Sequence, residues 1–143
     1  MIKHPECLTS TKEKIIKISG NNKRKAYFSN PTPLDHVVGS IDGCIIKEGQ
    51  RADNFIANEN KIVLIEFKGK DIEHACDQLF ASAEHAEMRD YIGNKSLAFL
   101  IIASHYPRAA NTKVQLAQSK AKKKYKAKLK VVCGHGHCSI DEL

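Results

Sequence analysis

The sequence predicts an α/β protein in which helices flank a mixed central sheet. Short apolar runs rich in β-branched residues fill the first half of the chain, and the turn-like Asn58-Glu59-Asn60 separates two of them. In the second half, segments with apolar residues at helical spacing alternate with apolar strands. We therefore expect strands that are first antiparallel and later arrive through helical crossovers.

Length and composition indicate one domain, residues 1–143, with enough chain to bury a core. The balance of 23 Lys+Arg against 16 Asp+Glu gives a formal charge of +7, which suits a polyanionic partner and equally suits solubility alone. No apolar run approaches the roughly 20 residues that span a bilayer, and no signal core is evident at the N-terminus. Five cysteines favour free thiols in a reducing compartment. We expect a cytoplasmic protein without membrane association.

The N-terminal third contains a weak helical pattern and two strand candidates. Three isoleucines give residues 1–23 a short apolar stripe, which predicts a helix. Residues 24–30 are a candidate short strand, followed by a break at Pro31 and Pro33. Residues 36–46 are rich in valine and isoleucine and predict a strand that a glycine bends.

A hairpin follows the turn at residues 47–50. Its arms are Asp53–Ala57 and Lys61–Lys68, joined by the turn at 58–60. The second arm is apolar on both faces over its first half, which is typical of a central strand covered on both sides. Polar side chains appear only at its end.

Two helices and two strands complete the predicted fold. Residues 71–91 have apolar residues at helical spacing and begin with an aspartate that suits an N-cap, so they predict the longest helix. Residues 96–104 predict a buried strand, residues 112–127 a basic helix and residues 129–133 a last short strand. The glycine-containing tail after residue 133 is expected to be loose.

The end of the hairpin carries the residues that predict a metal site. Pairing of the two arms brings Asp53 beside Glu66, and paired carboxylates with carbonyl and water ligands suit Mg²⁺ or Mn²⁺. Lys68 shares the face of Glu66, because the two lie two positions apart on a strand. It is then placed to orient or deprotonate a water, or to stabilise charge on a phosphate. The Phe67 carbonyl is a further expected ligand, and an ordinary surface Glu–Lys pair is the alternative.

This stretch resembles the core of the PD-(D/E)XK nuclease superfamily, the restriction-endonuclease-like fold. The family pattern of an Asp, a spacer, Glu-x-Lys and a helical Gln is matched by Asp53, Glu66, Lys68 and Gln78. The resemblance covers Ile41–Ser104 and implies an αβββαβ core, a divalent metal and phosphodiester hydrolysis. It thus implies a Mg²⁺-dependent endonuclease, with DNA favoured over RNA. A homodimer is a further expectation, because cutting two strands needs two sites or two events.

Some positions depart from the family pattern. Ala52 stands where the name-giving motif has Pro, and no Tyr follows Gln78 four residues on. Archaeal Holliday junction resolvases have a Glu on the first helix, which only Glu13 offers here, in a poor match. Asp42 is either an additional metal ligand, the family's Asp in place of Asp53, or a turn residue.

A run of basic residues in the second half offers phosphate contacts, although a solvated helix face explains it equally well. Arg24 and Lys25 are secondary candidates. The candidates for nucleic-acid binding are Arg51, Lys70, Lys113, Lys120, Lys124 and Lys128.

Two other functions are compatible with the sequence. The first is a catalytically inactive nucleic-acid-binding module on the same fold. The second is a zinc-stabilised interaction protein built on Cys133, His135, His137 and Cys138, whose spacing is tighter than that of standard zinc sites.

Overall fold

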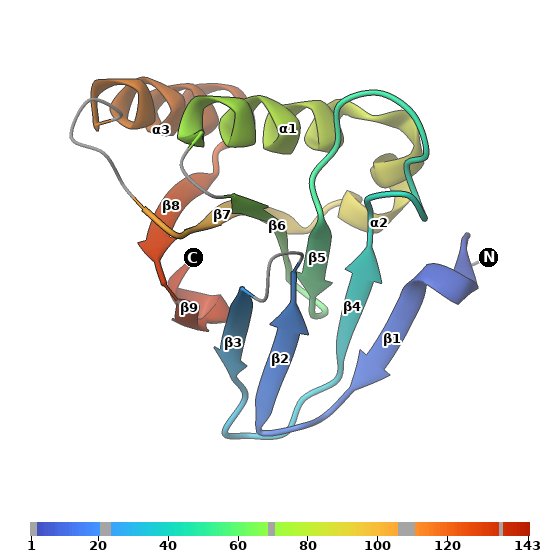
Figure 1. Ribbon diagram of the computed structural model, residues 1–143. Helices are drawn as coiled ribbons and strands as arrows, with labels where there is room; N and C mark the ends of the chain where they lie inside the picture. Colours follow the sequence, from blue (N-terminus) through green and yellow to red (C-terminus); the bar gives the residue numbers. More distant parts are fainter. Residues whose placement is uncertain (1–2, 21–23, 69–70, 106–110, 135) are drawn as a thin grey trace.

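The computed structural model describes residues 3–20, 24–68, 71–105, 111–134 and 136–143 (Figure 1). Its strands are β1 Leu8–Thr11, β2 Ile15–Ser19, β3 Lys25–Ser29, β4 His36–Ser40, β5 Asn54–Ala57, β6 Lys61–Lys68, β7 Ser96–Ala103, β8 Lys128–Cys133 and β9 Gly136–Ser139. Its helices are α1 Ile72–Glu84, α2 Arg89–Ile92 and α3 Asn111–Tyr125, and 3₁₀ turns span Pro5–Cys7, Ala86–Met88 and Ile140–Glu142.

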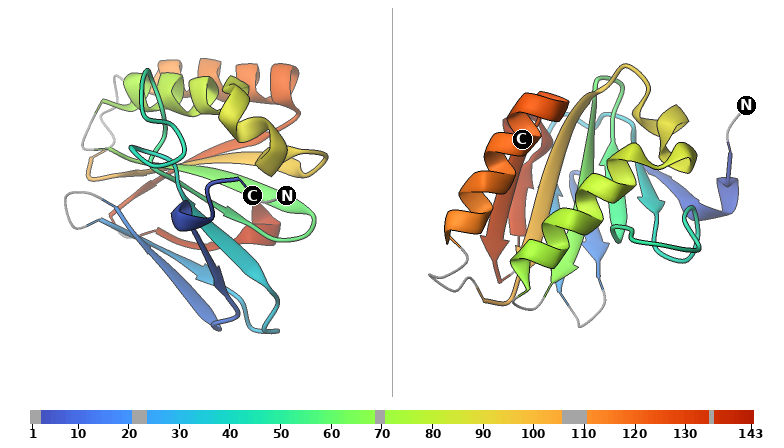
Figure 2. Two further views of the ribbon diagram at one scale, coloured as in Figure 1. Left: turned by 90° about the vertical axis from the view of Figure 1, so that its right-hand side faces the viewer. Right: turned by 90° about the horizontal axis from the view of Figure 1, so that it is seen from above.

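The centre of the molecule is a mixed sheet in the order β1-β4-β5-β6-β7-β8. The first four of these strands pair antiparallel, while β6, β7 and β8 are parallel. Helices α1 and α3 lie side by side across one face (Figure 1 and Figure 2, right), and a smaller β2-β3-β9 sheet lies on the opposite side (Figure 1). The predicted α/β class with a mixed, helix-flanked sheet is therefore confirmed.

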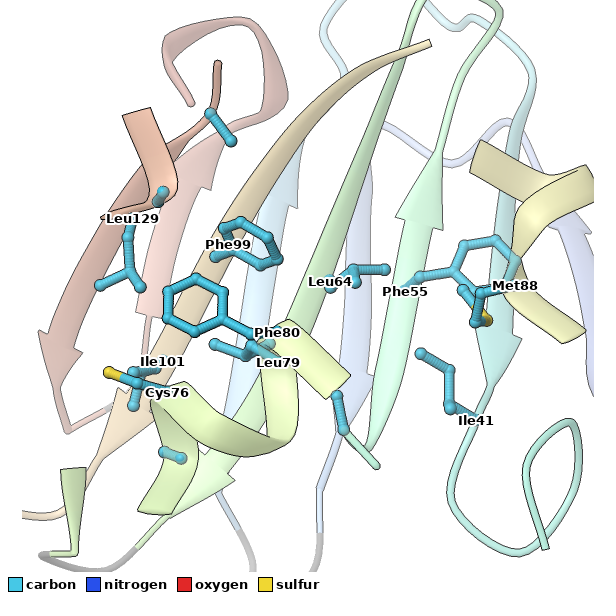
Figure 3. Close-up of a cluster of buried hydrophobic side chains, with 14 of the residues drawn as sticks. Ile41, Phe55, Leu64, Cys76, Leu79, Phe80, Met88, Phe99, Ile101 and Leu129 are labelled. Atoms are coloured by element: carbon cyan, nitrogen blue, oxygen red, sulfur yellow. The ribbon is translucent and has the colours of Figure 1, made fainter. Parts of the chain in front are cut away.

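Strand β6 divides the core into two apolar clusters, because its side chains alternate between the faces of the sheet. Ile62 and Leu64 pack on the helix side, whereas Val63 and Ile65 pack toward the three-stranded sheet. On the helix side, the ring of Phe80 on α1 meets the ring of Phe99 on β7 edge to face, with centroids 5.2 Å apart (Figure 3). This double coverage places the end of β6 at the edge of a scaffold that is apolar on both faces.

The prediction of a helix in residues 1–23 is wrong. The described part of this region forms β1 and β2 instead, with Ile16 and Ile18 buried and Ile15 exposed. The apolar residues thus follow the two-residue period of a strand, and their branched side chains suit a pleated surface. Within the described residues, no α-helix precedes β4, so the leading helix of the αβββαβ order is absent there.

Two predicted elements are shorter than expected. Strand β4 ends at Ser40, because residues 41–46 form a turn in which the Ile46 N–H donates to the Ile41 carbonyl at 3.0 Å. Helix α1 ends at Glu84, where His85 adopts extended backbone angles. With 13 residues, α1 is also shorter than the 15-residue α3, so the prediction that α1 is the longest helix is wrong.

The C-terminal tail and the cysteines also differ from expectation. Residues 136–139 are not loose but form β9, which pairs parallel to β3 and buries the side chain of Cys138. Cys7 and Cys44 form a disulfide, so the expectation of free thiols is wrong for this pair. Disulfides persist in oxidising environments, whereas the sequence favoured a reducing compartment. Among the helices described, none has the length and apolar character to cross a membrane.

Candidate active site

The antiparallel register of β5 and β6 sets Asp53 opposite Glu66. The ladder pairs Asn54 with Ile65, and one further step along it reaches these two acids. The Asp53 N–H donates to the Ile65 carbonyl at 3.1 Å. Its carboxylate Oδ2 in turn accepts the Phe67 N–H at 2.8 Å. Asp53 is therefore held at the end of the ladder by both its backbone and its side chain.

Glu66 is a buried carboxyl, only 2% exposed. Burial raises its pKa to about 8, and the nearby charge of Asp53 adds to the rise, while Lys68 opposes it. The Lys68 Nζ lies 3.4 Å from Glu66 Oε2. Glu66 Oε1 is buried without a hydrogen-bond partner in the described part of the protein. At neutral pH, Glu66 is therefore mostly protonated and carries an unsatisfied oxygen at the end of β6.

The pKa of Asp53 is also raised, first because the carboxyl is buried. The Phe67 N–H opposes this rise, whereas the negative charge of Asp42 adds to it. The two acids influence one another: beyond burial, the negative charge of Asp53 raises the pKa of Glu66, so a proton on Glu66 relieves the repulsion between the two carboxylates. A hard cation, which prefers oxygen ligands, can take the place of that proton.

The ligands available to such a cation are oxygens. Two carboxylates face each other, and the unpartnered Glu66 Oε1 requires a positive or donating neighbour. The carbonyl of Phe67 lies along the same strand edge as the N–H that Asp53 accepts. Across the described residues, no three His, Cys, Asp or Glu side chains form a metal-holding group. A Mg²⁺ ion, which keeps several waters and is held by one or two carboxylates, fits this set.

Asp42 lies near Asp53 but is engaged elsewhere. Its Oδ1 accepts from Arg51 Nε at 2.7 Å. The backbone N–H groups of Ile41 and Asp42 both donate to the Asp53 carbonyl, at 2.9 and 3.2 Å. The turn at 41–46 thus anchors Asp53 through its backbone, and the Asp42 side chain pairs with a cation of the protein itself.

Gln78 lies on α1 and contacts the loop before Asp53. Its Nε2 donates to the Arg51 carbonyl at 3.1 Å, and its Oε1 is buried without a partner in the described structure. The hydrogen bond of its amide thus goes to the loop and not to the two acids. A cavity of about 350 Å³ opens here. The residues that line it are Asp42, Gly49, Gln50, Arg51, His74 and Gln78.

Ser82 is a positioning residue that the sequence reasoning missed. It is fully buried on α1, and its Oγ accepts the Ala52 N–H at 2.6 Å. This bond ties the residue preceding Asp53 to the helix layer. The only signal in the sequence is a serine one turn after Gln78, close to the apolar stripe of α1.

The basic residues of α3 mostly contact the protein itself. Lys113 pairs with Glu73 at 2.6 Å, and Lys124 pairs with Glu84 at 2.8 Å. Lys120 lies over an aromatic ring of α1, 4.9 Å from its centroid. These contacts join α3 to α1. Because the two ion pairs are exposed, their net stabilisation is small and a phosphate can compete for the lysines.

The other basic candidates are more scattered. The Lys128 Nζ donates to the Glu142 carbonyl at 3.1 Å. Arg51 lines the cavity near Gln78, whereas Lys70 falls outside the described residues. Of the secondary candidates, Lys25 is on β3, and Arg24 has buried guanidinium nitrogens without a described partner.

The cysteines and histidines of the tail do not converge where they are described. Cys133 is exposed at the end of β8, whereas Cys138 lies on β9 and is buried. The His137 ring stacks on Tyr27 with centroids 4.8 Å apart. His135 falls outside the described residues. The arrangement of the three described residues gives no support to a zinc cluster.

Comparisons with known proteins identify no relative. No family model, no curated protein and no solved structure matches the chain. A functional assignment therefore depends on the geometry of the acid pair and on the chemistry that such a pair performs.

Proposed function

We propose that the protein is a metal-dependent nuclease of the PD-(D/E)XK type, hydrolysing phosphodiester bonds in nucleic acid, with DNA the favoured substrate. The observation that carries the proposal is the facing pair Asp53 and Glu66 at the end of two buried strands. Glu66 has a buried oxygen without a described partner, and Lys68 follows two residues later with its Nζ 3.4 Å from the carboxylate.

The order of elements around the pair supports the same proposal. Strands β4, β5 and β6 are antiparallel, α1 follows, and β7 returns parallel to β6. This is the βββαβ part of the core that the resemblance implies. The net charge of +7 favours a polyanionic substrate.

The residues that would hold a divalent cation are Asp53 and Glu66, with the Phe67 carbonyl. When bound, Mg²⁺ would polarise the phosphate and lower the pKa of a coordinated water. The Phe67 N–H fixes one oxygen of Asp53 at 2.8 Å, so this carboxylate is preorganised. Burial keeps Glu66 in a dry setting, where charge interactions with a phosphate are strong.

Lys68 is the group placed to assist the water. Its side chain is 22% exposed and reaches Glu66 from the same face of β6. It orients the water whose oxygen forms the new bond to phosphorus, and it offsets the charge that develops on the phosphate. The phosphorus–oxygen bond to the sugar breaks, the sugar oxygen takes up a proton, and the water releases one to solvent.

The test is cleavage of supercoiled plasmid and of single-stranded RNA with Mg²⁺ or Mn²⁺. We expect the wild type to cut plasmid, while Glu66→Gln and Lys68→Ala lose at least 100-fold in rate, the order seen for loss of one such catalytic group. The matched controls are Glu59→Gln in the exposed hairpin turn and Lys47→Ala in the exposed loop, which should cut like wild type. Mn²⁺ titration followed by electron paramagnetic resonance should show binding that Glu66→Gln weakens.

Each outcome has a distinct meaning. Cleavage by Glu66→Gln and Lys68→Ala at the wild-type rate would refute the assignment of the site. Tight binding of nucleic acid by wild type without metal-dependent cleavage would instead favour the inactive nucleic-acid-binding module.

A further inference from the structure

A second concave surface lies at the other end of the β5–β6 hairpin from the acid pair. It is a groove of about 1130 Å³ whose lining includes Asn58 and Asn60 of the hairpin turn, the start of β4 and part of α2. Asp53 and Glu66 stand at the opposite end of the same ladder, so the proposed hydrolysis does not use this surface. Helices α1 and α3 do not extend over β1 (Figure 2, right), which leaves this part of the sheet open.

The floor of the groove is apolar. Leu8 and Val37, which are only partly buried, line it together with Ala57. Tyr91 of α2 lines it as well, and its ring lies against the ring of Phe55 with centroids 5.3 Å apart. The volume exceeds that of most small-molecule pockets, roughly 300–1,000 Å³, and suits a segment of polypeptide.

Leu34 adds an exposed apolar side chain to this groove. It is 56% exposed, yet its backbone is held by Asn30, a polar side chain that is only 4% exposed. Asn30 Nδ2 donates to the Leu34 carbonyl at 3.0 Å, and Asn30 Oδ1 accepts the Leu34 N–H at 3.2 Å. The same Nδ2 donates to the Glu13 carbonyl at 3.0 Å. A partner that covers Leu34 therefore gains apolar contact without having to order the backbone.

Strand β1 borders the groove and forms an open edge of the six-stranded sheet. In the described residues it has one neighbour in the sheet, β4. The strand at the other edge, β8, carries Lys128 and Lys130, and lysines discourage association at a sheet edge. Leu8–Thr11 contains neither a charge nor a proline. Because Leu8 and Ser10 line the groove, an extended chain that pairs with β1 would turn alternate side chains toward it.

The rim of the groove is acidic, although the protein has a net charge of +7. Four acidic side chains and two lysines line it. Both lysines are engaged within the protein: Lys3 pairs with Asp90 at 3.2 Å, and Lys95 donates to two carbonyls of the β5–β6 turn at 2.6 and 2.9 Å. Asp35 pairs with Lys12 at 3.5 Å, but this pair is exposed and therefore weak.

The lysines of α3 do not offset this local charge. Helix α3 lies toward the β8 edge of the sheet, away from β1 (Figure 1). Charges more than about 8 Å apart are largely screened at physiological ionic strength, so the acids at the rim act most strongly on a ligand in the groove. The groove therefore repels nucleic acid and favours a basic partner.

We propose that the groove and the edge of β1 bind an extended segment of a partner protein, in which basic residues flank alternating apolar residues. The backbone of the segment pairs with β1, its apolar side chains enter the groove beside Leu34, and its basic side chains lie near Asp35 and Asp90. A second copy of this chain fits less well, because a two-fold interface would place two acidic rims together. The inference does not rest on the proposed nuclease function.

The test uses synthetic nine-residue peptides in EDTA, so that metal and hydrolysis play no part. In each peptide, an apolar residue (valine, isoleucine, leucine or phenylalanine) alternates with threonine over the five central positions, and two lysines, glutamates or serines flank each end. By fluorescence anisotropy, we expect the best lysine-flanked peptide to bind wild type about tenfold more tightly than its glutamate-flanked counterpart, because several weak charge contacts add together. N-methylation of the central amides removes the donors for strand pairing and should abolish binding.

Two variants at exposed side chains locate the site without disturbing the core. Leu34→Ser should weaken binding of the best peptide about tenfold. The matched control Leu116→Ser, at a leucine of α3 that is 67% exposed, should bind it like wild type. Asp35→Lys, at a side chain that is 81% exposed, should reduce the preference for lysine flanks to about threefold or less.

The outcomes separate the possible occupants. Equal binding of lysine-flanked and glutamate-flanked peptides across the whole set would overturn the inference, as would wild-type affinity in Leu34→Ser. Sedimentation velocity of the protein alone tests the second copy: a dimer that Leu34→Ser dissociates and Leu116→Ser does not would assign the groove to self-association and overturn the inference too. Peptide binding by a protein that never cleaves nucleic acid would refute the nuclease proposal alone.

Discussion

The raised pKa of Glu66 predicts that Glu66→Gln stabilises the protein at alkaline pH. In the unfolded chain, Glu66 loses its proton near pH 4.5, whereas in the folded protein its pKa is about 8. Between these values, the folded state binds a proton that the unfolded state has lost. The free energy of unfolding of the wild type therefore has its full value below pH 4.5, falls as the pH rises toward 8 and levels off above it. Glutamine keeps the shape of the protonated acid but does not titrate.

The size of the effect follows from the shift. Each pKa unit corresponds to about 1.36 kcal/mol, so the rise from 4.5 to about 8 gives nearly 5 kcal/mol over the whole window. Between pH 5 and pH 8.5, the stability of Glu66→Gln relative to wild type should increase by about 4 kcal/mol. Because Asp53 and Glu66 influence one another, the difference reports the titration of the pair, in which the shift of Glu66 is the larger part. This is a large fraction of the 5–15 kcal/mol that is typical of folded domains.

Urea unfolding followed by circular dichroism, at pH 5, 7 and 8.5 in EDTA, measures the difference. Glu59→Gln, at an exposed carboxyl, should run parallel to wild type at every pH. Adding Mg²⁺ at pH 8.5 should stabilise wild type more than Glu66→Gln, because two ionised carboxylates face the cation in wild type and only one does in the variant. Parallel stability curves for wild type and Glu66→Gln from pH 5 to pH 8.5 would show that Glu66 is not a buried, proton-binding carboxyl, and the reasoning would fail.

Two further predictions concern the scaffold. A Cβ on Gly20 would lie 2.2 to 2.7 Å from ring atoms of Phe67. Gly20→Ala should therefore lower the free energy of unfolding by about 1–3 kcal/mol in the same urea assay. The control Ser19→Ala, at the exposed neighbouring position, should change it little. The Cys7–Cys44 disulfide closes a separation of 37 residues, so its reduction by dithiothreitol should cost about 2–4 kcal/mol; a double alanine variant that responds to dithiothreitol as wild type does would contradict the bond.

Sequence-based prediction of the fold is most accurate where one hydrophobic period dominates a segment. The run Lys61–Lys68 is apolar on both faces and ends in polar residues, so its buried central position was predictable. The short arm Asn54–Ala57 and its three-residue turn then fix the register, which brings Asp53 opposite Glu66. The N-terminal strands were missed because each is only four or five residues long, and three nearby isoleucines fit either period.

Other features depend on contacts between distant segments. The pairing of Cys7 with Cys44 cannot be chosen among five cysteines by spacing alone. Arg51 and Asp42 form an ion pair only because residues 41–46 turn back on themselves. Ser82 accepts the Ala52 N–H across 30 positions of sequence, a partner that no local pattern indicates.

The parallel pairing of β3 with β9 has a consequence for how the protein folds. The register joins Ala26 to Gly136, so one edge of the β2–β3 hairpin stays unpaired until the chain has been made through Ser139. An unpaired strand edge is a template for association with other chains. During synthesis, the hairpin is therefore an early aggregation hazard that the last strand removes, and shortening the chain before residue 136 should reduce soluble yield even though the acid pair is intact.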